Sequence, residues 1–187
     1  MPPTPASPVL AALYEGDAER ARAAADGRAL DLFEAAALGD RARVDELLAA
    51  DPASAAAVAP DGFTALHLAA FFSRDAGIAR ALVAAGAPVS HAADNEMRVT
   101  PLNSAAAADA RDVAKILLDA GADPDAPQAG GYTPLHSAAA NGDPDLVELL
   151  IARGADPGKA ADDGRTPADF ADERGHPEVA ARLRAGA

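Results

Sequence analysis

Small apolar residues, leucines and polar turn residues recur along the chain in one ordered pattern, and each recurrence begins at a threonine. The four threonines are spaced 36, 33 and 33 residues apart, at Thr64, Thr100, Thr133 and Thr166. A Gly-Ala pair follows each of the first three, at positions 86–87, 121–122 and 154–155. A fixed period of this length is typical of stacked supersecondary units, none of which can bury its apolar face alone. The pattern therefore predicts a solenoid.

Each unit carries the local signals of two short helices. Three of the threonines precede a proline, so a capping hydroxyl comes directly before a residue suited to the first helical position. The first helix is expected to run about two turns to a glycine, at Gly39, Gly142 or Gly175. The second helix is expected to end at the glycine of the Gly-Ala pair, where a left-handed C-cap is favoured. Such short helices need stacked neighbours, because about 12 to 15 residues are required for stability in water.

Two rows of apolar positions define the expected core. Each first helix carries a pair of small residues that would let successive hairpins approach closely: Ala35-Ala36, Ala69-Ala70, Ala105-Ala106 and Ala138-Ala139. Each second helix carries an equivalent leucine, at Leu47, Leu82, Leu117, Leu150 and Leu183. In the last unit Asp172 and Arg184 replace apolar residues. We therefore expect the outer face of this unit to be polar and to end the stack.

Two stretches of these units carry a more specific signature. Residues 61–70 (DGFTALHLAA) and 131–139 (GYTPLHSAA) resemble the ankyrin-repeat consensus. The resemblance covers about residues 30–187 and is strongest in the units that start near 61, 98 and 131. It implies an all-α, curved ankyrin-repeat solenoid of helix–turn–helix units with β-turn fingers, a degenerate helical N-terminal cap and a polar C-terminal cap.

The resulting organisation is a single domain over residues 6–187, preceded by a disordered segment at 1–5. Its expected parts are a helical cap at 6–29, repeat 1 at 30–60, repeat 2 with insertions at 61–97, repeat 3 at 98–130, repeat 4 at 131–163 and a capping repeat at 164–187. The helical cap at 6–29 is expected to lack a finger. Gly16 lies only 23 residues before its equivalent Gly39, which is too short a spacing for an extended finger.

The second repeat breaks the period at two places. It has one extra residue between Ala70 and Gly86, and two more between Gly86 and Thr100. The first insertion brings Phe71 and Phe72 side by side on a short helix, where the two rings cannot both face the same core. At least one ring is therefore expected to be exposed, either as an interface anchor or as packing around the insertion.

Charge and composition exclude several functions. The chain has 29 acidic and 16 basic residues, for a formal net charge of −13. Because no basic stripe is present, binding to nucleic acid or to an anionic membrane is not expected. The absence of cysteine rules out a disulfide framework. Residues 1–8 lack the features of a signal peptide, and no apolar run approaches the ~18 residues of a membrane span, so a cytoplasmic protein is expected.

The histidines are the first candidates for catalysis or metal binding. His67 and His136 occupy the structural histidine position of the resembled family, whose ring bonds to nearby turn groups. They lie two units apart, about 20 Å at roughly 10 Å per helix layer, so they cannot share a metal. Asn103 takes this position in the unit between them, so the sequence does not establish whether that unit forms the same turn hydrogen bond. No Gly-rich phosphate loop or nucleophile paired with a base is present, so we expect no catalytic, cofactor or metal site.

The expected function is therefore that of a non-catalytic, monomeric module. As the resemblance implies, it would bind a partner protein, with a basic or neutral surface, through concave fingers and inner helices. A regulatory or accessory subunit of an enzyme encoded elsewhere is a second interpretation, and an enzyme that uses histidine and aspartate residues is a third. The candidate contact residues are Phe71, Phe72, Arg74, His91, Asn95, Glu96, Met97, Arg98, Gln128, Tyr132 and Arg165.

Overall fold

The computed structural model describes residues 7–186, so the segment 1–5, for which disorder is predicted, lies outside the described residues. The described chain contains twelve α-helices paired as hairpins: α1 (Pro8–Tyr14), α2 (Ala18–Ala25), α3 (Leu32–Leu38), α4 (Arg41–Ala50), α5 (Ala65–Leu68), α6 (Ala76–Ala84), α7 (Pro101–Ala107), α8 (Arg111–Asp119), α9 (Pro134–Asn141), α10 (Pro144–Ala152), α11 (Pro167–Glu173) and α12 (Pro177–Ala185). A π-helical turn, η2 (Ala69–Ser73), extends α5, and two 3-10 turns, η1 (Pro52–Ala56) and η3 (Ala129–Gly131), lie in the connections.

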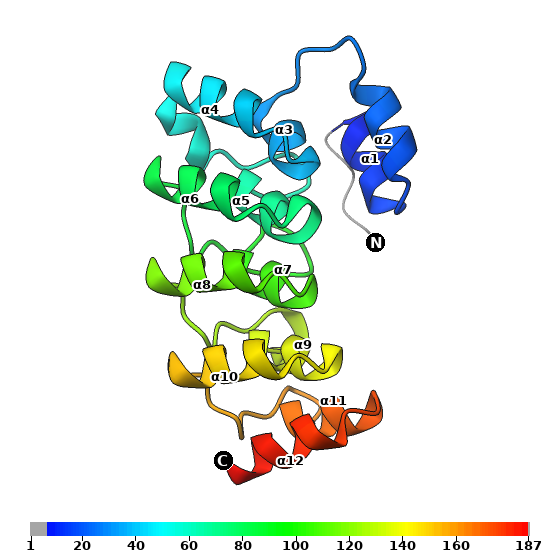
Figure 1. Cartoon of the computed structure of the whole chain (residues 1–187), viewed down its shortest axis with the longest axis vertical. Helices are drawn as coiled ribbons and strands as arrows, with labels where there is room; N and C mark the ends of the chain where they lie inside the picture. The colour runs from blue at the N-terminus through cyan, green and yellow to red at the C-terminus, as the bar shows by residue number, and fades with distance from the viewer. Residues whose placement is uncertain (1–6, 187) are drawn as a thin grey trace.

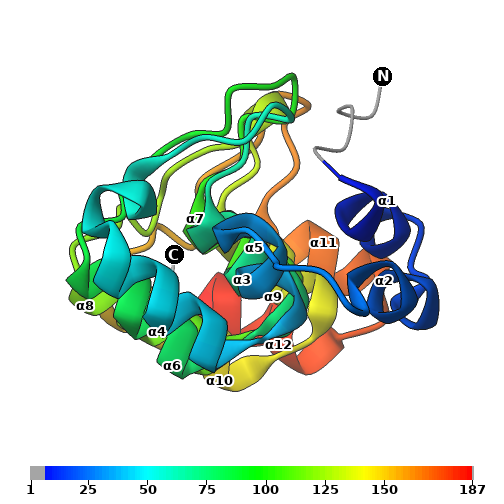
Figure 2. The same cartoon turned by 90° about the horizontal axis from the view of Figure 1, so that it is seen from above.

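Five hairpins, from α3–α4 to α11–α12, lie on one another in chain order and form a solenoid (Figure 1). The first helices form an inner layer and the second helices an outer layer. The connections between hairpins all reach toward the same side of the molecule, where they form a row of fingers (Figure 2). Within residues 7–186, the isolated bridge between Val58 and Thr64 is the one strand-like pairing. The predicted all-α solenoid is confirmed.

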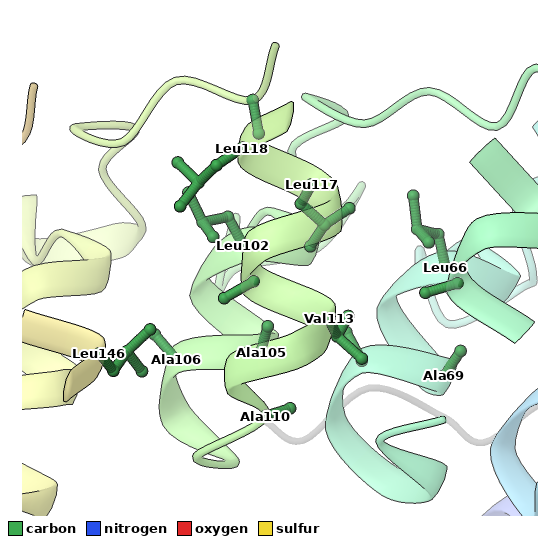
Figure 3. Packing of buried hydrophobic residues seen from close by; sticks show 14 of the residues in the cluster. Leu66, Ala69, Leu102, Ala105, Ala106, Ala110, Val113, Leu117, Leu118 and Leu146 are labelled. Carbon is green, nitrogen blue, oxygen red and sulfur yellow. The ribbon is translucent and has the colours of Figure 1, made fainter. Parts of the chain in front are cut away.

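The alanine pairs of the inner helices lie at the contacts between neighbouring hairpins (Figure 3). Ala69, Ala105 and Ala106 have no exposed surface. Because these side chains are small, helices in adjacent units can pack closely. The predicted leucine row is also buried, and Leu117 in α8 is one of its fully enclosed members. Leu47 differs from the expectation, because it is only partly buried.

The last hairpin turns charged side chains outward, as expected of a unit that ends a stack. Arg184 of α12 forms an ion pair with Asp172 of α11 at 2.6 Å, and about half of each side chain is exposed. The apolar side of the same hairpin faces the preceding unit through buried residues such as Leu183.

The same hydrogen-bond geometry at the start of three inner helices, α5, α7 and α9, ties each of these helices to the finger that follows it. In the second repeat, Nδ1 of His67 accepts hydrogen bonds from the backbone N–H of Thr64 at 3.2 Å and from its hydroxyl at 2.8 Å. The Nδ1 atom must be unprotonated to accept from a backbone N–H, so the proton lies on Nε2, which donates to the carbonyl of Val99 at 3.0 Å. His136 occupies the same position in the fourth repeat.

Asn103 reproduces this arrangement in the third repeat. Its Oδ1 atom accepts from the backbone N–H of Thr100 at 2.9 Å and from the Thr100 hydroxyl at 2.8 Å, while its Nδ2 atom donates to the carbonyl of Ala126 at 3.2 Å. The turn hydrogen bond that the sequence left open is therefore present, because an amide offers one acceptor and one donor at the same reach as the imidazole.

Neighbouring fingers are joined by single backbone hydrogen bonds. The amide of Asp94 donates to the carbonyl of Gly62 at 2.9 Å, and the amide of Ala129 donates to the carbonyl of Met97 at 2.9 Å. At Gly62, φ is +88° and a β-carbon would lie 2.7 Å from the backbone of Asp94, so only glycine allows this approach. The fingers are thus held side by side (Figure 2).

Both insertions of the second repeat are absorbed locally. The extra residue on the helical side widens the end of the inner helix into the π-helical turn η2, which closes at Arg74 in a left-handed conformation with φ of 53°. The longer finger folds back through Asn95, whose Nδ2 atom donates to the carbonyl of Asp61 at 2.9 Å. The following helix α6 keeps its buried Leu82 in the core row.

The N-terminal hairpin α1–α2 is helical, but it does not continue the stack. It lies beside the inner helices of the first two repeats, on the side away from the outer helices (Figures 1 and 2). The inner helices and the row of fingers together form the surface on this side, which is called the concave surface below. Leu10 is fully buried in a cluster with Phe63 and Leu68 of the second repeat. The segment expected as an N-terminal cap therefore covers part of the inner-helix surface.

Candidate functional site

A pocket of about 530 Å³ lies on the concave side of the molecule, between the N-terminal hairpin and the inner helices of repeats 2 and 3. Helix α1, the end of the second inner helix, two fingers and helix α7 contribute its walls. The lining residues are Ala11, Tyr14, Glu15, Phe63, His67, Leu68, Phe71, Phe72, Met97, Val99, Asn103, Ser104, Ala107 and Gln128. Most of this lining is apolar, which is typical of binding pockets.

The two insertions of the second repeat converge on this pocket. The π-helical turn supplies Phe71 and Phe72, and the longer finger supplies Met97. Phe71 is 44% exposed and Met97 is 41% exposed. The other large apolar residue of comparable exposure among the described residues, Val58, lies outside the pocket. Two breaks in the repeat period therefore place exposed apolar side chains in one site.

Aromatic rings form the wall next to the hairpin. The ring of Tyr14 lies 5.5 Å from that of Phe72 and 6.3 Å from that of Phe63, and Phe71 packs edge-on against Phe72 at 5.0 Å. The Tyr14 hydroxyl donates to Oδ2 of Asp61 at 2.8 Å. Burial, followed by this hydrogen bond and the negative charge of Asp61, raises the pKa of Tyr14 well above its ordinary value. Tyr14 therefore remains a neutral hydrogen-bond donor.

The neutral polar groups of the pocket fall into two classes. The side chains of His67 and Asn103 are fully engaged in the turn hydrogen bonds. Among the described residues, the hydroxyl of Ser104 and the side-chain amide of Gln128 have no hydrogen-bond partner. Glu15 is an exposed carboxylate in the lining, and it is paired with Arg20. The pocket thus offers two unused neutral hydrogen-bonding groups.

His67 is held in its neutral form. Burial lowers its pKa from 6.5 to about 4, and the neighbouring His91, whose ring lies 5.9 Å away, also lowers it. His136 has a lowered pKa for the same first reason. Both imidazoles use their two nitrogens in turn bonds, so neither presents a free base to a substrate.

Tyr132 and Arg165, two of the predicted contact residues, belong to a separate cluster farther along the stack. Arg165 donates to Asp163 at 2.7 Å, to Glu173 at 2.9 Å and to the hydroxyl of Tyr132 at 3.1 Å, and its guanidinium lies 4.4 Å from the ring centre of Phe170. The charged and polar groups of Tyr132 and Arg165 are therefore used within the molecule.

The other predicted residues divide between the pocket and the finger framework. Phe71, Phe72, Met97 and Gln128 are brought together in the pocket. The remaining five do not line it. Arg74 donates to the carbonyl of Ala108 at 3.3 Å, and the ring of His91 packs on that of His67. Asn95 donates to the backbone of the neighbouring finger, and Glu96 and Arg98 are exposed.

Sequence reasoning did not find the residues that close the pocket. Tyr14, Ala11 and Glu15 come from a hairpin that has no finger and no repeat partner, so no periodic signal places them on the concave surface. Ser104 and Ala107 lie on the inner helix of an otherwise regular repeat. The available signal was Tyr14 itself, the one aromatic residue of the hairpin.

Within residues 7–186, no group of three or more histidine, aspartate or glutamate side chains is arranged to hold a metal ion. None of the described helices has both the length and the hydropathy needed to cross a membrane. The candidate site on the described surface is therefore the apolar pocket.

A stack of helical hairpins with a recessed concave surface defines the class of helical-repeat proteins. Two family models match the chain, one described as ankyrin repeats (3 copies) over residues 32–128 and one described as ankyrin repeats (many copies) over residues 119–171. The chain belongs to the ankyrin-repeat family, which confirms the predicted resemblance. Ankyrin repeats generally mediate protein–protein interactions and are typically non-catalytic. In the comparison with curated proteins, no protein matches the chain.

Proposed function

We propose that this chain is a non-catalytic module that holds a partner protein on the concave surface formed by its fingers and inner helices, with the pocket at repeats 2 and 3 as the anchor point. The observation that carries the proposal is the convergence of Phe71 and Met97, both more than two-fifths exposed, on one pocket. Exposed apolar side chains grouped in this way mark interaction sites, because water disfavours their exposure.

The framework around the pocket supports this role. The finger that carries Met97 is bonded to the fingers on both sides, through Asp94 and Gly62 and through Ala129. A surface that is ordered before binding loses less conformational freedom when a partner docks. Recognition by this surface is therefore rigid and preorganised. We propose that the chain acts as a monomer in the cytoplasm.

The test of the proposal is capture of a partner from an extract of the source cells on immobilised protein. Wild type and Val58→Ala are expected to retain the same partner, because Val58 is 40% exposed but lies outside the pocket. Phe71→Ala and Met97→Ala are expected to lose it. With the purified partner, Phe71→Ala should weaken binding by about 2 kcal/mol, as for an aromatic anchor at an interface.

Phe71→Ala is a cleaner test than the double variant Phe71→Ala/Phe72→Ala, because Phe72 also packs on Tyr14 and supports the hairpin. Both variants should unfold in a single transition, which checks that the stack is intact. A partner retained equally by Phe71→Ala, Met97→Ala and wild type would contradict the assignment of the pocket, and equal loss by Val58→Ala would show that the effect is unspecific.

The acidic balance of the chain leads to a second prediction. With a net charge of −13, association with a partner of basic surface is expected to be accelerated by long-range attraction. The association rate should fall about tenfold or more as ionic strength rises from 0.01 to about 0.15 M, where the screening length shortens to ~8 Å. Stopped-flow mixing over a salt series measures this directly. A rate that does not depend on salt would exclude a basic partner surface.

A further inference from the structure

The pocket has a chemical character that narrows what a partner inserts into it. We propose that it receives one aromatic side chain with a polar tip, a tyrosine or a tryptophan, from a segment of the partner protein. This inference rests on the proposed function and specifies the contact that anchors it.

The size and lining favour an aromatic occupant. At about 530 Å³ the pocket lies in the range of specific ligand sites, and it has room for one large ring together with flanking backbone. The rings of Tyr14, Phe71 and Phe72 form one wall, and the side chain of Met97 also lines the pocket. Aromatic rings gain edge and stacking contacts with such a wall, and a sulfur atom adds a favourable contact of its own, beyond what an aliphatic side chain gains.

The unused polar groups favour a polar tip. The hydroxyl of Ser104 and the amide of Gln128 line the same pocket and have no partner among the described residues. A leucine or valine that displaced water from the pocket would leave these groups unpaired, which weakens binding. A phenol hydroxyl or an indole N–H can bond to them.

The charge of the pocket disfavours an ionised occupant. Its polar lining is neutral apart from Glu15, which is exposed and already paired with Arg20. A buried ammonium or carboxylate from the partner would find no buried counter-charge, and burial of an unpaired charge is strongly unfavourable. An uncharged side chain therefore complements this site.

The chain itself supplies an example of such a side chain on the adjoining surface. Tyr14 of the hairpin lies on Phe63 and Phe72, and its hydroxyl donates to Asp61 at 2.8 Å. An aromatic ring with a bonded polar tip is thus already accommodated at the edge of the pocket. A partner side chain placed beside Tyr14 would continue this intramolecular interface along the concave surface.

The first experiment uses small probes of defined chemistry on the full chain. N-acetyl-tyrosinamide, N-acetyl-tryptophanamide and N-acetyl-leucinamide are titrated separately, and binding is followed by nuclear magnetic resonance. The two aromatic amides are expected to shift the backbone signals of Met97 and Ala107 and the side-chain amide signal of Gln128. They should bind about tenfold more tightly than the leucine amide. No shift at these positions, or equal affinity for all three amides, would overturn the proposal.

A variant pair locates the binding. Ala107→Leu extends a side chain from the exposed end of α7 into the pocket and should abolish the shifts caused by the aromatic amides. Ala140→Leu makes the same change one repeat later, outside the pocket, and should leave them unchanged. Equal binding to wild type and both variants would place the amides elsewhere and contradict the proposal.

The second experiment identifies the source of the aromatic group. Random peptides displayed on phage are selected on wild type, with Ala107→Leu as the counter-selection surface. Enrichment of tyrosine or tryptophan at one position supports a partner side chain. Binding of the amides without such enrichment overturns it in favour of a free aromatic small molecule. If the amides fail to bind while Phe71→Ala still abolishes partner capture, this inference fails and the proposed function stands.

Discussion

Replacement of Leu117 by alanine is expected to lower the free energy of unfolding by about 2 to 5 kcal/mol, as large-to-small changes in a close-packed core do. Leu117 has no exposed surface and belongs to the main core cluster, in the middle of the stack (Figure 3). Its neighbours are held by repeats on both sides, so they can fill the resulting cavity only in part. The loss therefore combines reduced apolar burial with a residual cavity.

Equilibrium unfolding in urea, followed by circular dichroism, measures this change. Met97→Ala is the matched control, because it also shortens an apolar side chain in the neighbouring repeat, but one that is 41% exposed. Its cost should remain below about 1 kcal/mol. If Met97→Ala were the more destabilising of the two, the assignment of buried and exposed positions within the repeats would be wrong.

The stability of the protein is expected to fall as the pH falls from 6.5 to about 4, through the titration of His67. Burial lowers the pKa of this imidazole from 6.5 to about 4, so between these values the unfolded chain binds a proton that the folded chain does not. The stabilisation is complete above pH 6.5 and is lost as the pH decreases through this window. At about 1.4 kcal/mol per pKa unit, the loss is about 3 kcal/mol.

The third repeat supplies the variant that isolates this effect. His67→Asn introduces the side chain that makes the same three turn hydrogen bonds at Asn103 without titrating. It should keep stability near pH 7 within about 1 kcal/mol of wild type, whereas His67→Ala leaves the buried backbone N–H and hydroxyl of Thr64 without their acceptor and should cost at least about 2 kcal/mol.

Unfolding curves recorded from pH 4 to 7 distinguish these cases. His67→Asn should flatten most of the pH dependence and leave a smaller part from His136, whose pKa is also lowered. An unchanged slope in His67→Asn would show that other groups produce it. A His67→Ala variant as stable as wild type at neutral pH would contradict the structural role of the histidine and reopen a chemical one.

The fold could be predicted from the sequence because its determinants are local and repeated. The threonine before the inner helices α5, α7, α9 and α11, the glycine after the outer helices α6, α8 and α10, and the alanine pairs of the inner helices act within one unit or between neighbours. Each signal is present several times, so the period identifies it. The third repeat shows the limit of such reasoning, since the substitution of histidine by Asn103 preserves a geometry that the residue type alone left open.

The site could be predicted only in part. The broken period directed attention to Phe71, Phe72 and Met97, and the structure brings these residues together. The sequence carried no such signal for the position of the hairpin. Tyr14 and Phe63, which are in contact, lie 49 residues apart, and this contact is not repeated from unit to unit. Arg165 was predicted because it occupies the finger position directly before Thr166, but three acceptors within the molecule already engage its guanidinium.

The π-helical turn η2 also bears on how such a chain can change over generations. One inserted residue widens the end of an inner helix, and the left-handed Arg74 then returns the chain to α6 with Leu82 still in the core row. The insertion is therefore hidden from the rest of the stack, while the surface gains two rings, Phe71 and Phe72. A repeat protein built this way can acquire a new recognition surface through a length mutation, without a compensating change in its interior.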